Sequence, residues 1–253
     1  MAAIKGSNIS GLEILVPPSF AGILPVSPSR RRFVYERETI DGLRRTLRPH
    51  VTVFDVGCSY GVTTVMIALL IERTGAVHAF DGNADVLERA RELARANGID
   101  NVRWNTTLVG DAVKEAIPFF AVPDFRSPAS TLNRDITHWH QDAELRQVPM
   151  VSLDDYCERH GGRPDCIKID VEGAEFAVLQ GGERVLRQAR PSLVIETHGL
   201  EIVGILGSLQ ALTGVLARAA YAFVDLRTGE PVSGSTFAAL YAEKIGHLLA
   251  VPE

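Results

Sequence analysis

The sequence VTVFDVGCSYG, residues 51–61, joins a short strand to a turn bounded by glycines. Residues 51–56 are rich in β-branched and aromatic side chains, which favour a buried strand. Gly57 and Gly61 bound the turn, and the apolar run at 62–71 predicts a buried helix. A strand that continues through a glycine turn into a helix is typical of α/β proteins, whose ligands bind beyond the carboxyl ends of parallel strands.

Strands and helices alternate on both sides of this segment. Periodicity and Gly or Pro boundaries predict helices at 33–47, 84–97, 173–179 and 201–218, with a short helix after Gly181-Gly182. They predict further strands at 76–80, 102–105, 166–171, 192–196, 221–226 and 247–251. This alternation implies right-handed crossovers and a mostly parallel sheet with helices on both faces. The last two strands enclose a Gly, Pro and Ser turn at 228–235, so we expect an antiparallel edge there.

Two regions depart from the regular pattern. Prolines and three consecutive arginines in residues 1–32 argue against a long helix or a central strand, so we expect a surface extension or a flap over the site. Residues 111–149 hold prolines, aromatics, His138 and His140. Long irregular connections are commonly functional, so we expect an insertion that covers the substrate, with its histidines facing the cleft or solvent. Residues 33–253 are expected to form a single domain.

The composition indicates a globular protein. The 253 residues are 46% hydrophobic and 23% charged, which is close to average usage. A net charge of −5 argues against unspecific binding to nucleic acid, and no uncharged apolar run reaches the roughly 18 residues of a membrane helix. Three cysteines and an N-terminus without a signal pattern favour a reducing, cytoplasmic location.

The turn at 57–61 is a candidate cofactor site. A dinucleotide site requires G-x-G-x-x-G, but here the spacing is G-x-x-x-G, and Asp55 precedes the first glycine by two residues. A carboxylate there repels a pyrophosphate but suits a ligand with a cationic amine, such as S-adenosylmethionine. Amides near Gly61 could hold an anionic group, and Asp81, 20 residues after Gly61, could accept hydrogen bonds from ribose hydroxyls. Both aspartates could instead form turns or caps.

A second cluster of ionisable residues lies in KIDVEGAE, residues 168–175. Alternation places Lys168 and Asp170 on one side of the strand, with Asp170 at its tip. A charge inside a covered strand is costly unless it is paired or functional, so Lys168 is expected to act in the site or to pair with Asp170 or Glu172. Glu172 and Glu175 could instead stabilise the start of the next helix.

The neighbouring strand ends in Glu196-Thr197-His198, and adjacent parallel strands would bring Glu196 near Asp170. Such acids and a histidine could deprotonate a hydroxyl or bind a divalent metal. We nominate Asp170 as general base, Glu196 or His198 as the alternative base or orienting partner, and Lys168 as the group that holds a carboxylate. A surface position is the alternative for His198.

These two clusters, in this order, resemble the FkbM family of S-adenosylmethionine-dependent methyltransferases over about residues 33–200. The matching segments are Tyr35-Glu36, Phe54-Asp55-Val56-Gly57 to Gly61, Phe80-Asp81, Leu153-Asp154-Asp155, Lys168 to Glu175, and Val194-Ile195-Glu196. The block from Lys168 to Glu175 matches the family pattern at every position and is specific to it. The cofactor loop, in contrast, is shared by many methyltransferases. The family usually has Ala-Asn where this chain has Cys58-Ser59, and Glu-Pro where it has Asp81-Gly82. Asp81 keeps the carboxylate on a shorter side chain.

The resemblance implies the class I methyltransferase fold, a Rossmann-like α/β architecture with a seven-stranded, mostly parallel sheet and one antiparallel strand. It implies S-adenosyl-L-methionine as the donor and O-methylation, often of a sugar or polyketide hydroxyl in natural-product biosynthesis. The expected cofactor-binding residues are Glu36, Asp55, Gly57, Ser59, Tyr60, Gly61, Asp81 and Gly82.

Several alternatives remain at this point. No metal is expected, but a metal-assisted reaction would use Mg²⁺ or Mn²⁺ on Asp170, Glu172 and Glu196. N-methylation, a non-catalytic cofactor-binding module and an NAD-dependent oxidoreductase are the other candidates. The expected partner is a small-molecule acceptor, with no nucleic acid and no membrane. The sequence gives neither the acceptor nor the oligomeric state.

Overall fold

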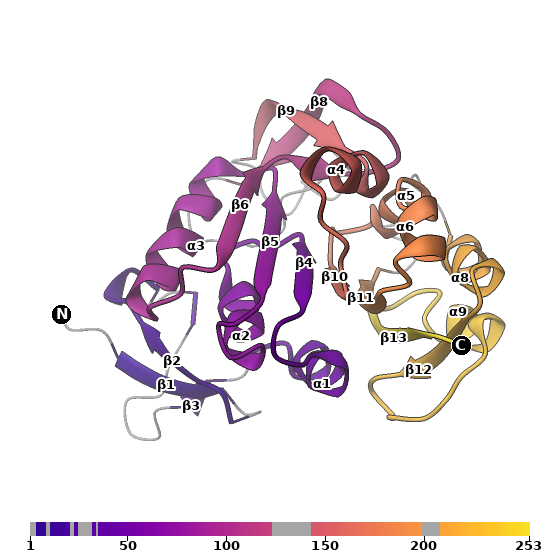
Figure 1. Cartoon of the computed structure of the whole chain (residues 1–253), viewed down its shortest axis with the longest axis horizontal. Coiled ribbons are helices and arrows are strands. Elements are labelled where there is room, and N and C mark those ends of the chain that lie inside the picture. Colours follow the sequence, from indigo (N-terminus) through magenta and orange to yellow (C-terminus); the bar gives the residue numbers. More distant parts are fainter. Residues whose placement is uncertain are drawn as a thin grey trace.

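Seven strands form the central sheet of the computed structural model, in the order β12-β13-β11-β10-β4-β5-β6 (Figure 1). Their bounds are β4 Thr52–Val56, β5 Ala76–Asp81, β6 Val102–Thr106, β10 Cys166–Ile169, β11 Ser192–Thr197, β12 Tyr221–Asp225 and β13 Gly246–Pro252. Strand β13 runs antiparallel to both of its neighbours, and the other pairs are parallel. The predicted seven-stranded sheet with one antiparallel strand is therefore confirmed, although that strand lies second from the edge.

The structure describes residues 4–8, 11–20, 23–24, 32–33, 35–122, 143–198 and 208–253. His138, His140 and the first part of the helix predicted at 201–218 lie outside these ranges. Every helix among the described residues is too short or too polar to cross a lipid bilayer.

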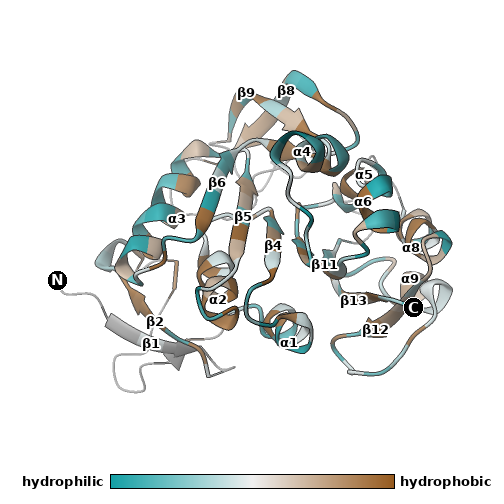
Figure 2. Ribbon diagram, in the orientation of Figure 1, coloured by the Kyte–Doolittle hydropathy of each residue, from teal (hydrophilic) through white to brown (hydrophobic). Residues whose placement is uncertain are grey.

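Helices cover both faces of the sheet because alternate strand residues point to opposite sides. One core contains Val53 and buries α1 (Arg37–Thr46), α2 (Val62–Leu70) and α3 (Ala84–Ala96). The other contains Phe54 and buries the second group of helices. These are α4 Leu153–His160, α5 Glu175–Gln180, α6 Glu183–Gln188, α8 Leu209–Arg218 and α9 Gly234–Leu240. Figure 2 shows the resulting amphipathic pattern on α3, where hydrophilic and hydrophobic residues alternate.

Three described segments at the N-terminus form short strands. Strands β1 (Ile4–Asn8), β2 (Glu13–Val16) and β3 (Arg32–Phe33) form a separate sheet. This sheet is tied to the end of α3, because the Asn97 side chain hydrogen-bonds the backbone N–H and carbonyl of Leu15 at 2.7 and 2.9 Å. Phe33 belongs to β3, so the helix predicted from residue 33 begins only at Arg37.

A third sheet occupies part of the region predicted to be irregular. It contains β7 (Leu108–Val109), β9 (Glu144–Val151) and β8 (Lys114–Ala121), in that order. The prediction was wrong for these strands because proline was taken as a strand breaker. Pro118 lies on β8, an edge strand, where a missing N–H disrupts no inner ladder.

Two helices were also missed. Ser152 caps α4 by accepting a hydrogen bond from the N–H of Asp155, and Ser233 caps α9 in the same way from Thr236. Helix α9 therefore replaces part of the turn expected at 228–235. Serine is a preferred N-cap residue, so Ser152 and Ser233 are local signals that could have predicted both helix starts.

Candidate functional site

One pocket lies at the carboxyl ends of the central strands, where ligands of parallel α/β sheets bind. We call its two walls the loop side and the acid side. The loop side consists of Gly57, Cys58 and Ser59, which follow β4, and of Asp81 and Gly82, at the end of β5 and directly after it. The acid side consists of Lys168, Asp170, Glu172 and Glu196, which lie on or after β10 and β11. A largely apolar surface is added by Thr107, Leu108 and Val109, which precede the region expected to be irregular, and by Phe119 within it.

The glycines of the loop are required by close packing. Gly57 has a φ of 78°, and a Cβ at this position would lie 1.7 Å from the carbonyl oxygen of Asp170. Gly61 has a φ of 73°, and its Cβ would lie 2.6 Å from that of Ala90 on α3. Gly57 therefore lets the loop side and the acid side meet backbone to backbone.

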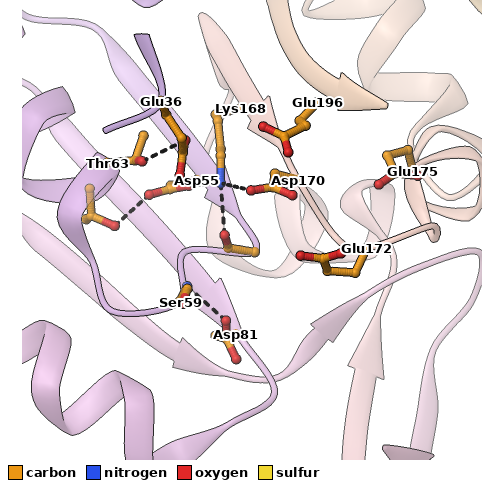
Figure 3. Close-up of polar contacts among 12 residues, drawn as sticks. Glu36, Asp55, Ser59, Thr63, Asp81, Lys168, Asp170, Glu172, Glu175 and Glu196 are labelled. Carbon is orange, nitrogen blue, oxygen red and sulfur yellow. Dashed lines mark hydrogen bonds and ion pairs between the residues drawn. The ribbon is translucent and has the colours of Figure 1, made fainter. Parts of the chain in front are cut away.

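Asp81 is fixed in the pocket by two backbone donors. Its Oδ2 accepts the N–H of Ser59 at 2.9 Å (Figure 3). Its Oδ1 accepts the N–H of Asn83 at 2.8 Å. Burial raises the pKa of Asp81 to about 6, although both donors favour the carboxylate. Each oxygen keeps a further lone pair for a ligand hydroxyl, so the predicted ribose contact is sterically available.

Asp55 does not line the pocket, contrary to its expected place beside a ligand amine. It is fully buried, and its Oδ2 accepts a hydrogen bond from Thr64 at 2.5 Å. Tyr60 and Gly61 are also outside the lining, and the N–H of Gly61 donates to Cys58 at 2.8 Å rather than to a ligand. Asp55 is turned inward because it lies opposite Lys168 in the β4–β10 register.

Lys168 links the two sides of the pocket. Its Nζ lies 2.9 Å from the Gly57 carbonyl oxygen, 3.3 Å from Asp170 Oδ2 and 3.5 Å from Asp55 Oδ1 (Figure 3). Burial alone would lower the pKa of Lys168, but the surrounding carboxylates, led by Asp170, raise it well above its usual value. Lys168 is therefore a buried cation that holds Asp170, as predicted. The predicted alternative of a pair with Glu172 is replaced by a pair with Asp55.

Three residues that line this pocket have a strained backbone. Glu36, Ser59 and Glu172 all line it, and their φ values are 37°, 46° and 51°. Non-glycine residues in this left-handed region are uncommon and cluster at functional sites. The Glu36 carboxylate accepts a hydrogen bond from Thr63 at 3.2 Å, and burial raises the pKa of Glu36 to about 7.

The acid side holds carboxylates with different proton affinities. Burial raises the pKa of Asp170, and it raises that of Glu172 to about 7. Burial would do the same for Glu196, but a hydrogen bond from His247 Nε2 at 3.1 Å, with the charge of that imidazole, lowers the Glu196 pKa overall. At neutral pH, Asp170 and Glu172 are the stronger proton acceptors of this group.

His198 is buried behind the acid side rather than exposed. Its Nδ1 lies 2.8 Å from Glu175 Oε1, and its Nε2 lies 3.4 Å from Glu172 and 3.8 Å from Glu196. Burial opposes protonation, but these carboxylates, led by Glu175, raise the pKa of His198 to about 10. A protonated imidazole cannot accept a proton, so His198 is an orienting partner here and the alternative of a base at this residue is not supported.

Sequence reasoning missed His247, Thr63 and the apolar residues of β7 and β8. His247 meets Glu196 because β13 pairs with β11 antiparallel, in a register that sets these two residues opposite each other. No local pattern marks this histidine, since the pairing depends on strand order. Among the described residues, the set that could hold a metal is Asp170, Glu196 and His198, rather than the predicted set with Glu172.

The comparisons with known proteins identify the fold and the family. A crystal structure of methyltransferase FkbM from Methylobacillus flagellatus KT is similar, with a TM-score of 0.50 and 16% identity over 81% of this chain and 44% of that chain. A crystal structure of a methyltransferase homolog from Pyrococcus horikoshii is also similar, with a TM-score of 0.51 and 15% identity over 85% of this chain and 66% of that chain. The chain thus spans less than half the length of the Methylobacillus protein, and no curated protein matches its sequence significantly. The methyltransferase FkbM domain model matches residues 55–222, more than half of the chain, so this chain belongs to the FkbM methyltransferase family.

Proposed function

We propose that this protein transfers the methyl group of S-adenosyl-L-methionine to a hydroxyl of a small molecule, such as a sugar or another natural product. Membership of the methyltransferase family implies the donor. The observation that carries the proposal is the shared pocket, in which the loop side faces Asp170 and Glu196 across one cavity. A donor held on one side and an acceptor held on the other would meet without diffusing apart.

The loop side suits the donor. Asp81 offers carboxylate lone pairs to the ribose, and Leu108 and Phe119 offer an apolar surface to the adenine. Ser59 Oγ is buried and lacks a hydrogen-bond partner among the described residues, so it can accept or donate to the ligand. Glu36 supplies a carboxylate for the amine, in place of the predicted Asp55.

The acid side suits the acceptor. The donor supplies a methyl group already activated on a sulfonium, so the protein has to align the acceptor oxygen and assist loss of its proton. Asp170 accepts that proton, because Lys168 holds one of its oxygens and burial raises its pKa above the ordinary value. Glu196, fixed by His247, orients the hydroxyl. The products are a methyl ether, S-adenosylhomocysteine and a proton.

Calorimetry with S-adenosyl-L-methionine tests the donor before any acceptor is known. We expect one site per chain, and a marked loss of affinity in Asp81→Asn. The acceptor is then sought by transfer of an isotope-labelled methyl group to panels of sugars, polyketides and amines. Absence of binding heat from folded protein would overturn the proposal. Labelling confined to amines would replace O-methylation by N-methylation.

A further inference from the structure

We propose that Asp170, Glu196 and His198 bind one divalent transition-metal ion, of which Mn²⁺ is the representative. One donor atom of each of these three residues lies within 4.8 Å of the other two. We assign His198 Nε2 as the nitrogen ligand, since it lies 3.8 Å from Glu196 Oε1. Donors that share an ion at ~2.1 Å are at most ~4.2 Å apart, so closure around an ion requires shifts of roughly half an ångström.

The imidazole is already oriented as a metal ligand. Its Nδ1 is held at 2.8 Å by Glu175, and the same Glu175 oxygen accepts the N–H of Gly173 at 3.0 Å. The side chains of His198 and Glu175 are each only 2% exposed. Metal-binding histidines typically make this contact from the second ring nitrogen to a carboxylate, because it fixes the ring and sets the free nitrogen toward the ion.

The two carboxylates are oriented in the same way. Asp170 uses Oδ2 for Lys168, at 3.3 Å, and Glu196 uses Oε2 for His247, at 3.1 Å. Each acid therefore has one anchored oxygen and one oxygen left for the cluster. Three candidate ligands, each held by a different outer partner, distinguish this arrangement from a group of solvated acids.

The donor set indicates the class of ion. Two oxygens and one imidazole nitrogen suit Mn²⁺, Fe²⁺, Co²⁺ or Zn²⁺ better than Mg²⁺, which prefers oxygen alone. The ion would replace the proton on His198 Nε2 as the positive charge among the carboxylates. This inference rests on the proposed function for its chemical purpose, because the ion, held by Asp170 and Glu196, would lower the pKa of the acceptor hydroxyl, whose proton would leave to solvent instead of to Asp170.

The test is metal binding by the whole protein, without an acceptor. Protein treated with chelator and then desalted is titrated with Mn²⁺, and binding is followed by electron paramagnetic resonance and by calorimetry. We expect one Mn²⁺ per chain and no comparable site for Mg²⁺. Glu175→Gln should weaken binding by about 10–100-fold, since Glu175 only orients the ligand. His198→Gln should abolish the site.

Matched controls separate this inference from the proposed function. His50→Gln, at an exposed histidine, should bind Mn²⁺ as the parent protein does. Calorimetry with S-adenosylhomocysteine and thermal melting show whether each variant is folded, and donor binding by chelated protein tests the proposed function separately. The inference is overturned if folded parent protein binds no Mn²⁺ at millimolar concentration. It is equally overturned if His198→Gln and Glu196→Gln, folded by these criteria, bind the ion unchanged.

Discussion

The two sides of the pocket are held in place by different forces. The loop side depends on backbone approach, since Gly57 lies against the Asp170 carbonyl and Asp81 is held by two backbone N–H groups. The acid side depends on charge, since Lys168 holds Asp170 and His247 holds Glu196. Substitutions of the glycines on the loop side should therefore act through shape, and substitutions on the acid side through uncompensated charge.

Gly57→Ala should have the largest effect. The added Cβ meets a backbone carbonyl, which cannot move aside as a side chain can, and the φ of 78° adds strain. We expect a loss of about 4 kcal/mol or more in the free energy of unfolding, measured in urea. Gly98→Ala is the control, because Gly98 has a φ of 63° but nothing within 4 Å of a Cβ, and it should cost only about 1 kcal/mol. Equal losses would show that conformation, and not contact, defines the loop side.

Lys168→Met should destabilise the acid side by about 3–5 kcal/mol, because it leaves Asp55 and Asp170 buried without their cation. Adding Asp55→Asn should recover part of the loss by removing one of the two charges. Lys114→Met is the control, since Lys114 pairs with Asp111 in solvent and should contribute less than about 1 kcal/mol. Denaturant unfolding measures the stability of the two single variants and of the double variant. A similar loss in the free energy of unfolding at Lys168 and Lys114 would contradict an acid side that is held by charge.

The difference between the two sides also explains what the sequence could predict. The strand at 52–56, the glycine turn and the segment 168–175 were predicted because periodicity and turn residues are local signals. The orientation of Asp55 was not predicted, because it depends on the pairing of Asp55 with Lys168, which lies more than a hundred residues away in the sequence. Likewise, His247 acquires its role only when β13 pairs with β11. The structure therefore adds mainly long-range pairing to the sequence prediction.

Asp81 should link pH to donor affinity. Asp81 has to be ionised to accept two ribose hydroxyls, and its pKa of about 6 places this change near neutrality. We expect the affinity for S-adenosyl-L-methionine to fall about tenfold from about pH 7.5 to about pH 5. Asp81→Asn should bind about tenfold more weakly at the higher pH and lose most of that pH dependence. An exposed control, Asp111→Asn, should behave as the parent, and an unchanged slope in Asp81→Asn would assign the dependence to another group.

The same shift has an opposite effect on stability without the donor. Since burial raises the pKa of folded Asp81 above its ordinary value of 3.8, the folded state holds this proton more tightly than the unfolded state. Ionisation of Asp81 therefore lowers the free energy of unfolding as the pH rises from its ordinary pKa of 3.8 to the folded value of about 6. Asp81→Asn should remove this contribution, which is measured by unfolding the free protein at several pH values.

Ser59→Gly should have the smallest effect, with opposite signs for folding and binding. Its φ of 46° is strained for serine, and its buried Oγ has no hydrogen-bond partner among the described residues. Glycine relieves the backbone strain and removes the unpaired hydroxyl, so the free protein should gain about 0.5–1 kcal/mol in the free energy of unfolding. If Oγ binds the donor, calorimetry should show a several-fold loss of affinity in the same variant. Ala220→Gly relieves a similar φ of 57° at an exposed position and should stabilise without weakening binding. A stabilised Ser59→Gly with unchanged affinity would mean that the strain at residue 59 serves only the packing of the loop.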